Sequence, residues 1–167
     1  MRKLLILLIT SLAFSTVTDI DGNVYETVVI GDQLWMAENL KVTHYNNGED
    51  IPTGLNSEST GDWPNTIEGA YAIYYDEQSN LEIYGNLYNW YAIDDERGVC
   101  PDGWHVPSDE EWTILMDYLG GALIAGLKMK DVLNWDGTNE SGFTALPSGM
   151  IHPNNYGSSE YLNVAIA

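Results

Sequence analysis

The sequence predicts an α+β fold made of short twisted antiparallel strands, one well-capped helix and long irregular loops. Short runs rich in β-branched and aromatic residues recur between Gly and Asp turn residues, which is typical of such strands. Only residues 108–119 combine a clear helical period with start and stop signals. With 167 residues, the chain is long enough to bury the core of one domain.

Residues 16–40 are expected to form two β-hairpin segments. Asp21-Gly22 separates two apolar runs, and this dipeptide is typical of a two-residue hairpin turn. A second pair of runs, at residues 28–30 and 34–36, flanks Gly31-Asp32. Their β-branched and aromatic residues predict a strand on each side of this second turn.

The predicted helix has a clear beginning, face and end. Ser108 and Glu111 fit a capping box, with Ser108 as the N-cap and Glu111 at the third helical position. Gly120 and Gly121 follow the last periodic residue, as a left-handed C-cap requires. One apolar stripe runs along the helix and consists of Trp112, Leu115, Met116 and Leu119. The helix is therefore expected to be a packing element.

The middle of the chain is predicted to contain loops and short strands. Residues 46–68 are rich in Asn, Gly, Ser, Thr, Pro and acids, which predicts a long loop. Loops of this length are usually either functional or disordered. Residues 70–75 favour a strand, and residues 81–84 favour its return strand, which Gly85 ends. Residues 87–93 fit a short buried helix or a strand, because periodicity does not separate the two over so few residues.

The last third of the chain is predicted to return to mixed structure. Residues 123–129 favour a second short helix, and residues 134–142 form an irregular acidic loop. Residues 143–150 have the composition of a strand.

The N-terminus has the pattern of a secretory signal peptide at residues 1–15. Arg2 and Lys3 form a basic start, residues 4–12 are apolar, and residues 13–15 are suited to cleavage. The apolar run is too short for a membrane anchor, and no cysteine follows it to carry a lipid. The sequence therefore predicts a secreted or cell-surface protein in which residues 16–167 form one domain without a membrane span.

The charge of the chain limits its partners. The formal net charge is −19, and removal of Arg2 and Lys3 with the leader takes it to −21. Such a charge repels phosphate backbones, so nucleic acid is excluded as a partner. The acidity favours solubility outside the cell, and the alternative interpretation is that it binds divalent cations, which prefer carboxylate and carbonyl oxygens.

Four blocks of residues, in order along the chain, resemble one known family. The most specific block is the run Val-Cys-Pro-Asp-Gly-Trp-His-Val-Pro-Ser at residues 99–108, followed by Glu111-Trp112. The others are residues 17–40, residues 84–92 and residues 142–147. The chain resembles the Fibrobacter succinogenes major paralogous domain family. That family is similar to C-type-lectin-like domains and to formylglycine-generating enzymes, so the resemblance implies a C-type-lectin-like fold. It implies no general biochemical activity.

Cys100 is the only cysteine of the chain, although the predicted compartment is oxidising. Members of the family that this chain resembles usually continue to a terminal cysteine. The resemblance therefore implies that this domain is truncated at its C-terminus and that Cys100 is one half of a disulfide. Intermolecular pairing is the alternative. A nucleophile assisted by His105 is the least favoured interpretation.

Two tryptophans are candidates for ligand binding. Trp63 and Trp135 lie in polar loops. Aromatic rings pack on the flat C–H faces of sugars, and the polar end of the side chain can form a hydrogen bond with a hydroxyl. The alternative is that each ring only fastens its own loop. The tryptophans that lie in the resembling blocks are flanked by apolar residues and are expected in the core: Trp35, Trp90, Trp104 and Trp112.

The loop at residues 134–140 is a candidate calcium site. Its oxygen-bearing side chains are Asn134, Asp136, Asn139 and Glu140. C-type lectins bind calcium with a similar mixture in an irregular loop, but their sugar-reading tripeptides are missing here. The alternative is a loop held by Asx turns. The three histidines, at positions 44, 105 and 152, share no metal-ligand spacing.

These observations favour a secreted, non-catalytic binding module for a polysaccharide or a surface protein, with calcium as the one cofactor they indicate. The alternative is a structural or adhesive subunit of an extracellular assembly. A degenerate relative of formylglycine-generating enzymes ranks last, because that activity requires a copper-binding pair of cysteines and the chain has one.

Overall fold

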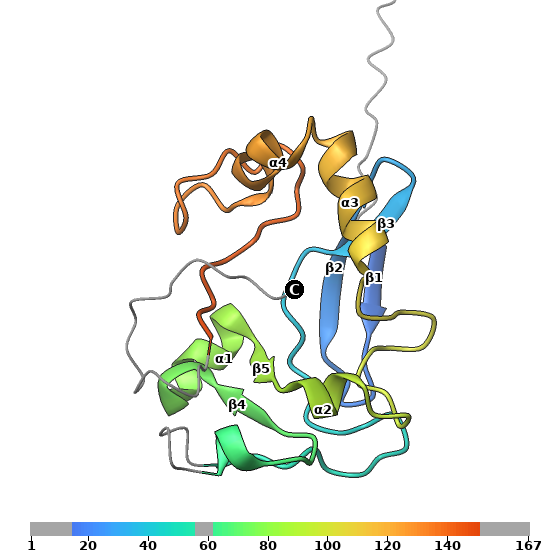
Figure 1. The fold of residues 1–167 in the computed structure, drawn as a ribbon, viewed down its shortest axis with the longest axis vertical. Helices are drawn as coiled ribbons and strands as arrows, with labels where there is room; N and C mark the ends of the chain where they lie inside the picture. The colour runs from blue at the N-terminus through green and yellow to red at the C-terminus, as the bar shows by residue number, and fades with distance from the viewer. Residues whose placement is uncertain (1–14, 56–61, 151–167) are drawn as a thin grey trace, which may run out of the picture.

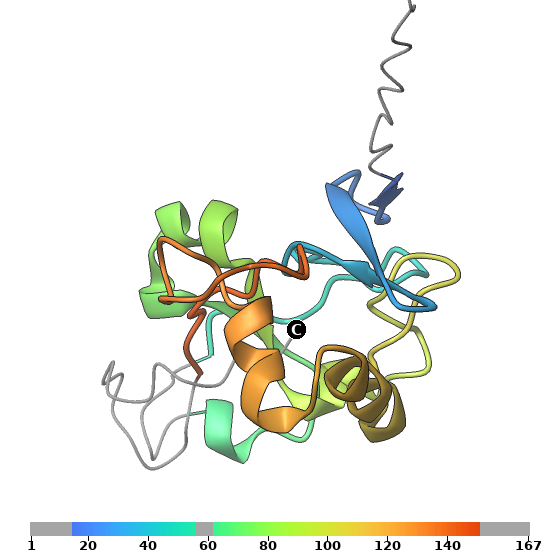
Figure 2. The ribbon, with the colours of Figure 1, turned by 90° about the horizontal axis from the view of Figure 1, so that it is seen from above.

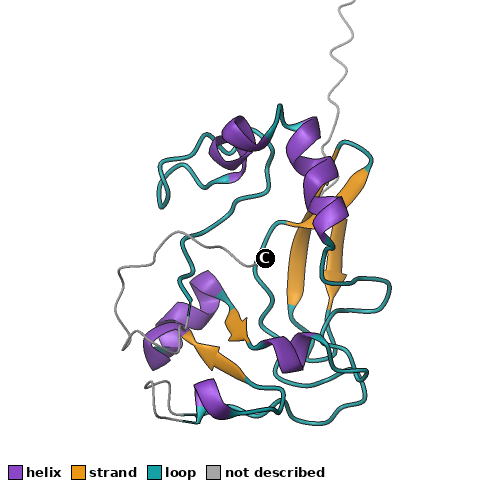
Figure 3. Cartoon of the chain, in the orientation of Figure 1, coloured by secondary structure: helices purple, strands orange, loops and turns teal. Residues whose placement is uncertain are grey.

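The computed structural model describes residues 15–55 and 62–150. These residues form the predicted α+β fold, with two small antiparallel sheets, four α-helices and two 3-10 turns joined by long loops (Figures 1 and 3). The predicted leader lies outside the described residues except for Ser15, which is the first residue of strand β1 (Ser15–Thr18). No helix in residues 15–55 and 62–150 is long and apolar enough to cross a membrane.

The first sheet consists of the two predicted hairpins. Strands β1, β2 (Val24–Ile30) and β3 (Gln33–Met36) follow one another in an antiparallel meander. The second turn is as predicted, with Ile30 paired to Gln33.

The first turn is longer than the predicted two residues. Asp19 and Asn23 are joined by a backbone hydrogen bond of 3.1 Å, so three residues form the loop, and Gly22 adopts a positive φ of 84°. A type I turn followed by a left-handed glycine has this geometry. The carboxylate of Asp19 accounts for the extra residue, because it accepts hydrogen bonds from the backbone and side chain of Asn23.

The second sheet pairs β4 (Tyr71–Ile73) with β5 (Asn86–Tyr88). The predicted return strand at residues 81–84 is wrong, because these residues belong to helix α1 (Gln78–Tyr84). Strand β4 pairs instead with residues 86–88, where Asn86 is opposite Ile73. Gly85 does end the preceding element, with its N–H bonded to the carbonyl of Leu81 and a φ of 68°.

Residues 87–93 contain both of the predicted alternatives. Strand β5 ends at Tyr88, and the one-turn helix α2 (Trp90–Ile93) begins two residues later with Asn89 as its N-cap. Only Ala92 of this helix is buried. The expectation that Trp90 lies in the core is therefore wrong: its side chain is 66% exposed, because one short turn has only one face to bury.

Helix α3 (Asp109–Tyr118) is capped at both ends as predicted. The Ser108 side chain accepts from the Glu111 N–H, and the Glu111 carboxylate accepts from the Ser108 N–H. At the other end Gly121 N–H bonds to Met116 C=O and Gly120 N–H bonds to Asp117 C=O, which is a Schellman motif.

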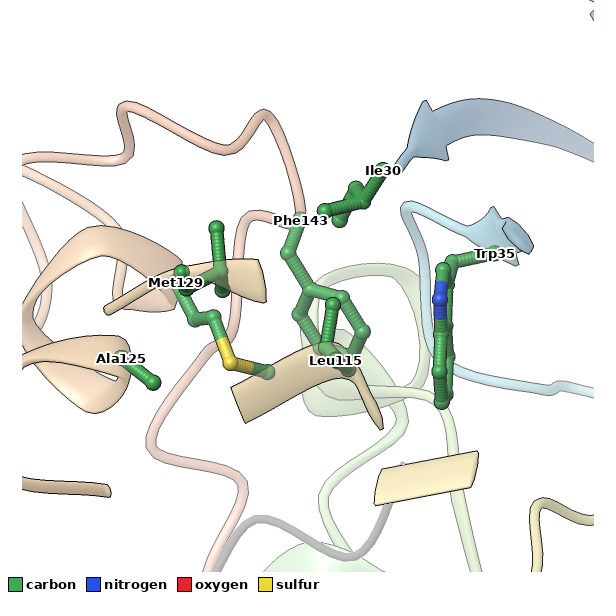
Figure 4. Close-up of a cluster of buried hydrophobic side chains, with 7 residues drawn as sticks. Ile30, Trp35, Leu115, Ala125, Met129 and Phe143 are labelled. Atoms are coloured by element: carbon green, nitrogen blue, oxygen red, sulfur yellow. The ribbon is translucent and has the colours of Figure 1, made fainter. Parts of the chain in front are cut away.

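The predicted stripe of α3 packs on the first sheet. Leu115 and Leu119 are buried together with Ile30 and Trp35 from the sheet, and Trp112 and Met116 pack against the same cluster. Figure 4 shows Phe143 and Met129 completing this core. Met129 comes from helix α4 (Ala122–Met129), the predicted second helix, which lies beside α3 (Figure 2).

Residues 143–150 do not form the predicted strand. Phe143 is buried, but the extended segment makes only an isolated parallel bridge, between Ala145 and Lys130. Lys130 follows α4 directly, so no neighbouring strand is present to continue the ladder. The apolar composition of this segment reflects burial rather than sheet pairing.

A second apolar cluster lies under the loops of the other half of the fold. It consists of Val42, Tyr45, Ile51, Ala92 and Val99. The predicted loop at residues 46–68 is irregular where it is described, apart from a 3-10 turn (Trp63–Asn65) and a bridge between His44 and Asp50. A further 3-10 turn (Tyr74–Asp76) joins β4 to α1.

The core position of Leu115 gives a stability prediction. Leu115→Ala removes a fully buried side chain and leaves a cavity, so the free energy of unfolding should fall by about 2–5 kcal/mol. Urea denaturation followed by circular dichroism measures it.

Ile114→Ala is the matched control, because the neighbouring Ile114 on the same helix is 49% exposed. It should change the free energy of unfolding by less than about 1 kcal/mol. Equal losses in the two variants would contradict the packing of α3.

Candidate functional site

A pocket of about 570 Å³ lies on the side of the second apolar cluster, between the loop before β4 and helix α2 (α2 and β4 are labelled in Figure 1). Three separate stretches of chain and the α2 residue Tyr91 form its walls. Its lining residues are Asp50, Pro52, Ile67, Glu68, Gly69, Tyr91, Asp94, Asp95 and Arg97. The pocket therefore combines many hydrogen-bond acceptors with one aromatic ring and two apolar side chains.

Asn89 joins two of these walls. Its side-chain oxygen accepts from the N–H groups of Ala70 and Ala92 at 2.9 and 3.0 Å, and its amide nitrogen donates to the carbonyl of Glu68 at 2.9 Å. The same side chain thus caps α2 and holds the Glu68–Ala70 segment beside it. This geometry fixes Glu68 and Tyr91 relative to one another.

Arg97 organises the third wall. Its Nε and Nη2 donate to the two carboxylate oxygens of Asp95 at 2.8 and 2.7 Å, and Nη1 donates to Glu49 at 2.7 Å. The guanidinium also lies 3.8 Å from the ring centroid of Tyr45, as a cation–π contact. The hydrogen bonds from Arg97 lower the pKa of Asp95 to about 2 and raise the pKa of Arg97 itself.

Tyr45 explains why Gly69 lines the pocket. Tyr45 is fully buried, and its hydroxyl lies where a Cβ on residue 69 would stand. The backbone of Ala92 occupies the same space, at 3.0 Å. A glycine is therefore needed for the chain to pass this close to the ring that supports Arg97.

The pocket edge at Asp50 is tied to the first hairpin through His44. The Nε2 atom of His44 lies 2.9 Å from Asp50, and Nδ1 lies 2.6 Å from Asp21 in the β1–β2 turn. Asp21 also accepts from the backbone N–H and the hydroxyl of Thr43. The hydrogen bond and charge of Asp21, followed by the charge of Asp50, raise the pKa of His44.

Comparison with known proteins shows which family the chain belongs to. The Fibrobacter succinogenes major domain (Fib_succ_major) matches the chain over residues 28–164, which is more than half of it. The chain belongs to this family. No curated protein and no solved structure matches it. The likeness to C-type lectins therefore stays a prediction.

In this Fib_succ_major domain the predicted calcium loop lies outside the pocket, and its amide side chains are used within the loop. Asn134 donates to the Asp131 carboxylate at 2.8 Å, and Asn139 bonds to the backbone and hydroxyl of Thr144 at 2.8 and 3.0 Å. Glu140 lies 4.0 Å from Lys128, and Asp136 is exposed. These contacts match the Asx-turn alternative, while calcium binding stays a prediction.

The two predicted ligand tryptophans also lie outside the pocket lining. Trp135 is half-buried, with the ammonium of Lys130 4.6 Å from its ring centroid. Trp63 is half-buried in the 3-10 turn that precedes Ile67. Binding by either ring stays a prediction, and the exposed aromatic side chains on α2 are instead Trp90 and Tyr91.

Cys100 is half-buried against the second apolar cluster, and its thiol is free. Burial raises the pKa of the thiol. His105 is engaged elsewhere, with Nε2 2.8 Å from the Glu111 carboxylate. Within residues 15–55 and 62–150, no three His, Cys, Asp or Glu side chains are grouped to hold a metal ion.

The sequence does not predict the pocket residues, because they come from separate segments of the chain. One signal was available: the block at residues 84–92 contains Asn89, Trp90 and Tyr91 next to one another. An Asn directly before a short apolar run is an N-cap pattern, and it would have marked α2 and its exposed aromatic residues.

The His44 contacts give a pH prediction. The folded-state pKa of His44 should exceed the value of about 6.5 of an unfolded chain. Its ion pairs therefore stabilise the fold fully below about pH 6.5, and this contribution is lost as the pH rises through the folded-state pKa. An NMR titration of the imidazole C–H signals measures the pKa.

Asp21→Asn should return the pKa of His44 toward about 6.5, because it removes the first and closest partner. Asp102→Asn, an exposed carboxylate outside this cluster, is the control and should leave it unchanged. If the pKa of His44 is the same in Asp21→Asn as in the unaltered protein, the contact between His44 and Asp21 does not form.

Proposed function

We propose that this Fib_succ_major domain is a non-catalytic binding module of an exported protein and that its pocket binds a polysaccharide. The leader pattern at residues 1–15 supports export. The resemblance to C-type-lectin-like domains supports a fold in which irregular segments carry the ligand site. The observation that carries the proposal is the composition of the pocket.

A sugar ring presents hydroxyls that donate hydrogen bonds and C–H faces that pack on apolar groups. Carboxylates accept from hydroxyls more strongly than neutral groups do. The pocket provides Glu68 and Asp94 as exposed acceptors and Tyr91, 45% exposed, as an aromatic surface. Ile67 and Pro52 add apolar surface at its edge.

The exposed aromatic side chains of α2 also favour a chain-like ligand. The neighbouring Trp90 extends the exposed aromatic surface of α2 beyond the pocket, so that a polymer has more than one ring to contact. The walls are held by Asn89 and Arg97 before any ligand arrives, which lowers the entropy cost of binding.

A structural or adhesive subunit is the second candidate, and one surface favours it. Large apolar side chains are exposed on α4 and on the loop that follows it, including Leu123, Leu127 and Leu133. Exposed apolar surface of this kind marks sites of protein association.

Binding to a panel of immobilised polysaccharides tests the proposal. The domain should bind at least one of them in the presence of a chelator as well as in its absence, because the pocket needs no metal ion for the contacts described. Tyr91→Ala should weaken this binding about tenfold by removing the aromatic wall.

Tyr118→Ala is the control, since Tyr118 is exposed on α3 outside the pocket lining. It should bind as the unaltered domain does. Concentration-dependent assembly in sedimentation experiments, with no binding to any glycan, would favour the structural subunit instead. Binding lost on chelation would favour the calcium loop over the pocket.

A further inference from the structure

We propose that the pocket recognises a glycan through a protonated amino group on a sugar ring, so that its preferred ligands are amino sugars that are not acetylated. This inference rests on the proposed function, because it names the class of saccharide that the pocket accepts.

The first step is the charge balance of the pocket wall. Arg97 is the only cation in the lining, and its guanidinium is already bonded to both Asp95 and Glu49. Its remaining surface is covered on one side by the Tyr45 ring. The single positive charge of Arg97 is therefore shared between two carboxylates, and the rest of the pocket stays acidic.

The second step concerns the carboxylates that remain. Asp50 is paired with Nε2 of His44, but Glu68 and Asp94 have no ion-pair partner within the described part of the chain. Both are exposed to solvent. The hydroxyls of a neutral sugar can donate to both carboxylates, but they supply no opposite charge. A protonated amine supplies that charge and three hydrogen-bond donors.

The third step is the frame that holds these groups together. Asn89 bonds to the carbonyl of Glu68 and caps α2, and Asp94 is the C-cap residue of the same helix. Tyr91 lies on this helix and lines the pocket together with both acids. An aromatic ring beside two carboxylates attracts an ammonium group through its π face as well as by charge.

The test compares glucosamine oligomers with N-acetylglucosamine oligomers of the same length, which differ only in the charge and acetylation of the nitrogen. Isothermal titration calorimetry at about pH 5.5, where the sugar amine is protonated, measures both affinities. We expect the glucosamine oligomer to bind about tenfold more tightly, and this preference to shrink as salt is added.

The variants Asp94→Asn and Glu68→Gln keep the shape of each side chain and remove its charge. Each should weaken binding of the glucosamine oligomer about threefold. Asp117→Asn and Glu110→Gln on α3 are the controls, because they remove the same charges at exposed positions outside the pocket lining. They should leave binding within experimental error, and thermal unfolding of all four variants shows whether the fold is kept.

The outcomes separate this inference from the proposed function. Tighter binding of the acetylated oligomer would overturn the inference and leave the polysaccharide module standing. Binding of neither oligomer, nor of any other glycan, would overturn both. Equal losses in the pocket variants and the α3 controls would overturn the assignment to this pocket. Equally tight binding of a lysine oligomer would also overturn it, because the ligand would then be recognised by its amines without the sugar.

Discussion

The pairing of Arg97 with Asp95 and Glu49, supported by the ring of Tyr45, is the constraint on which the account of the pocket depends. It connects a surface loop to the second apolar cluster through one buried aromatic side chain. It also takes up the single positive charge of the lining. The acidic character of the pocket therefore follows from how the cation is used and not only from the number of acids in the chain.

The two halves of the fold have different tasks. Helix α3 and the first sheet bury the larger apolar side chains, including Trp35, Leu115 and Phe143. The second cluster is smaller and underlies loops that are ordered mainly by polar contacts, such as those of Asn89 and Asp21. One side of the molecule is therefore a closely packed core. The other side carries exposed polar groups in loops that pack on the second apolar cluster.

The sequence predicted the elements whose signals are local. The capping box of Ser108 and the glycines at 120 and 121 determine both ends of α3 from neighbouring residues alone. The two hairpins are likewise set by their turn residues. The predictions at residues 81–84 and 143–150 were wrong because apolar composition does not distinguish a strand from an extended or helical segment. Strand formation there depends on whether a partner is present, and that is decided elsewhere in the chain.

The site was less predictable than the fold. The polar stretches of the sequence point to Trp63, Trp135 and the loop at residues 134–140, yet none of them lines the pocket. The pocket unites Asp50, Glu68 and Asp94, which are far apart along the chain. The pattern of a single sequence does not show that residues so far apart come together in one pocket. Trp90 was assigned to the core because apolar neighbours surround it, although a helix of one turn buries only Ala92.

The most direct test of the account is a map of ligand contacts by backbone NMR shifts during titration with glucosamine oligomers. The largest shifts should fall on residues 50–52, 67–69 and 91–97, with little change in residues 134–140. Shifts concentrated in the 134–140 loop or on α4, with the pocket residues unmoved, would contradict it.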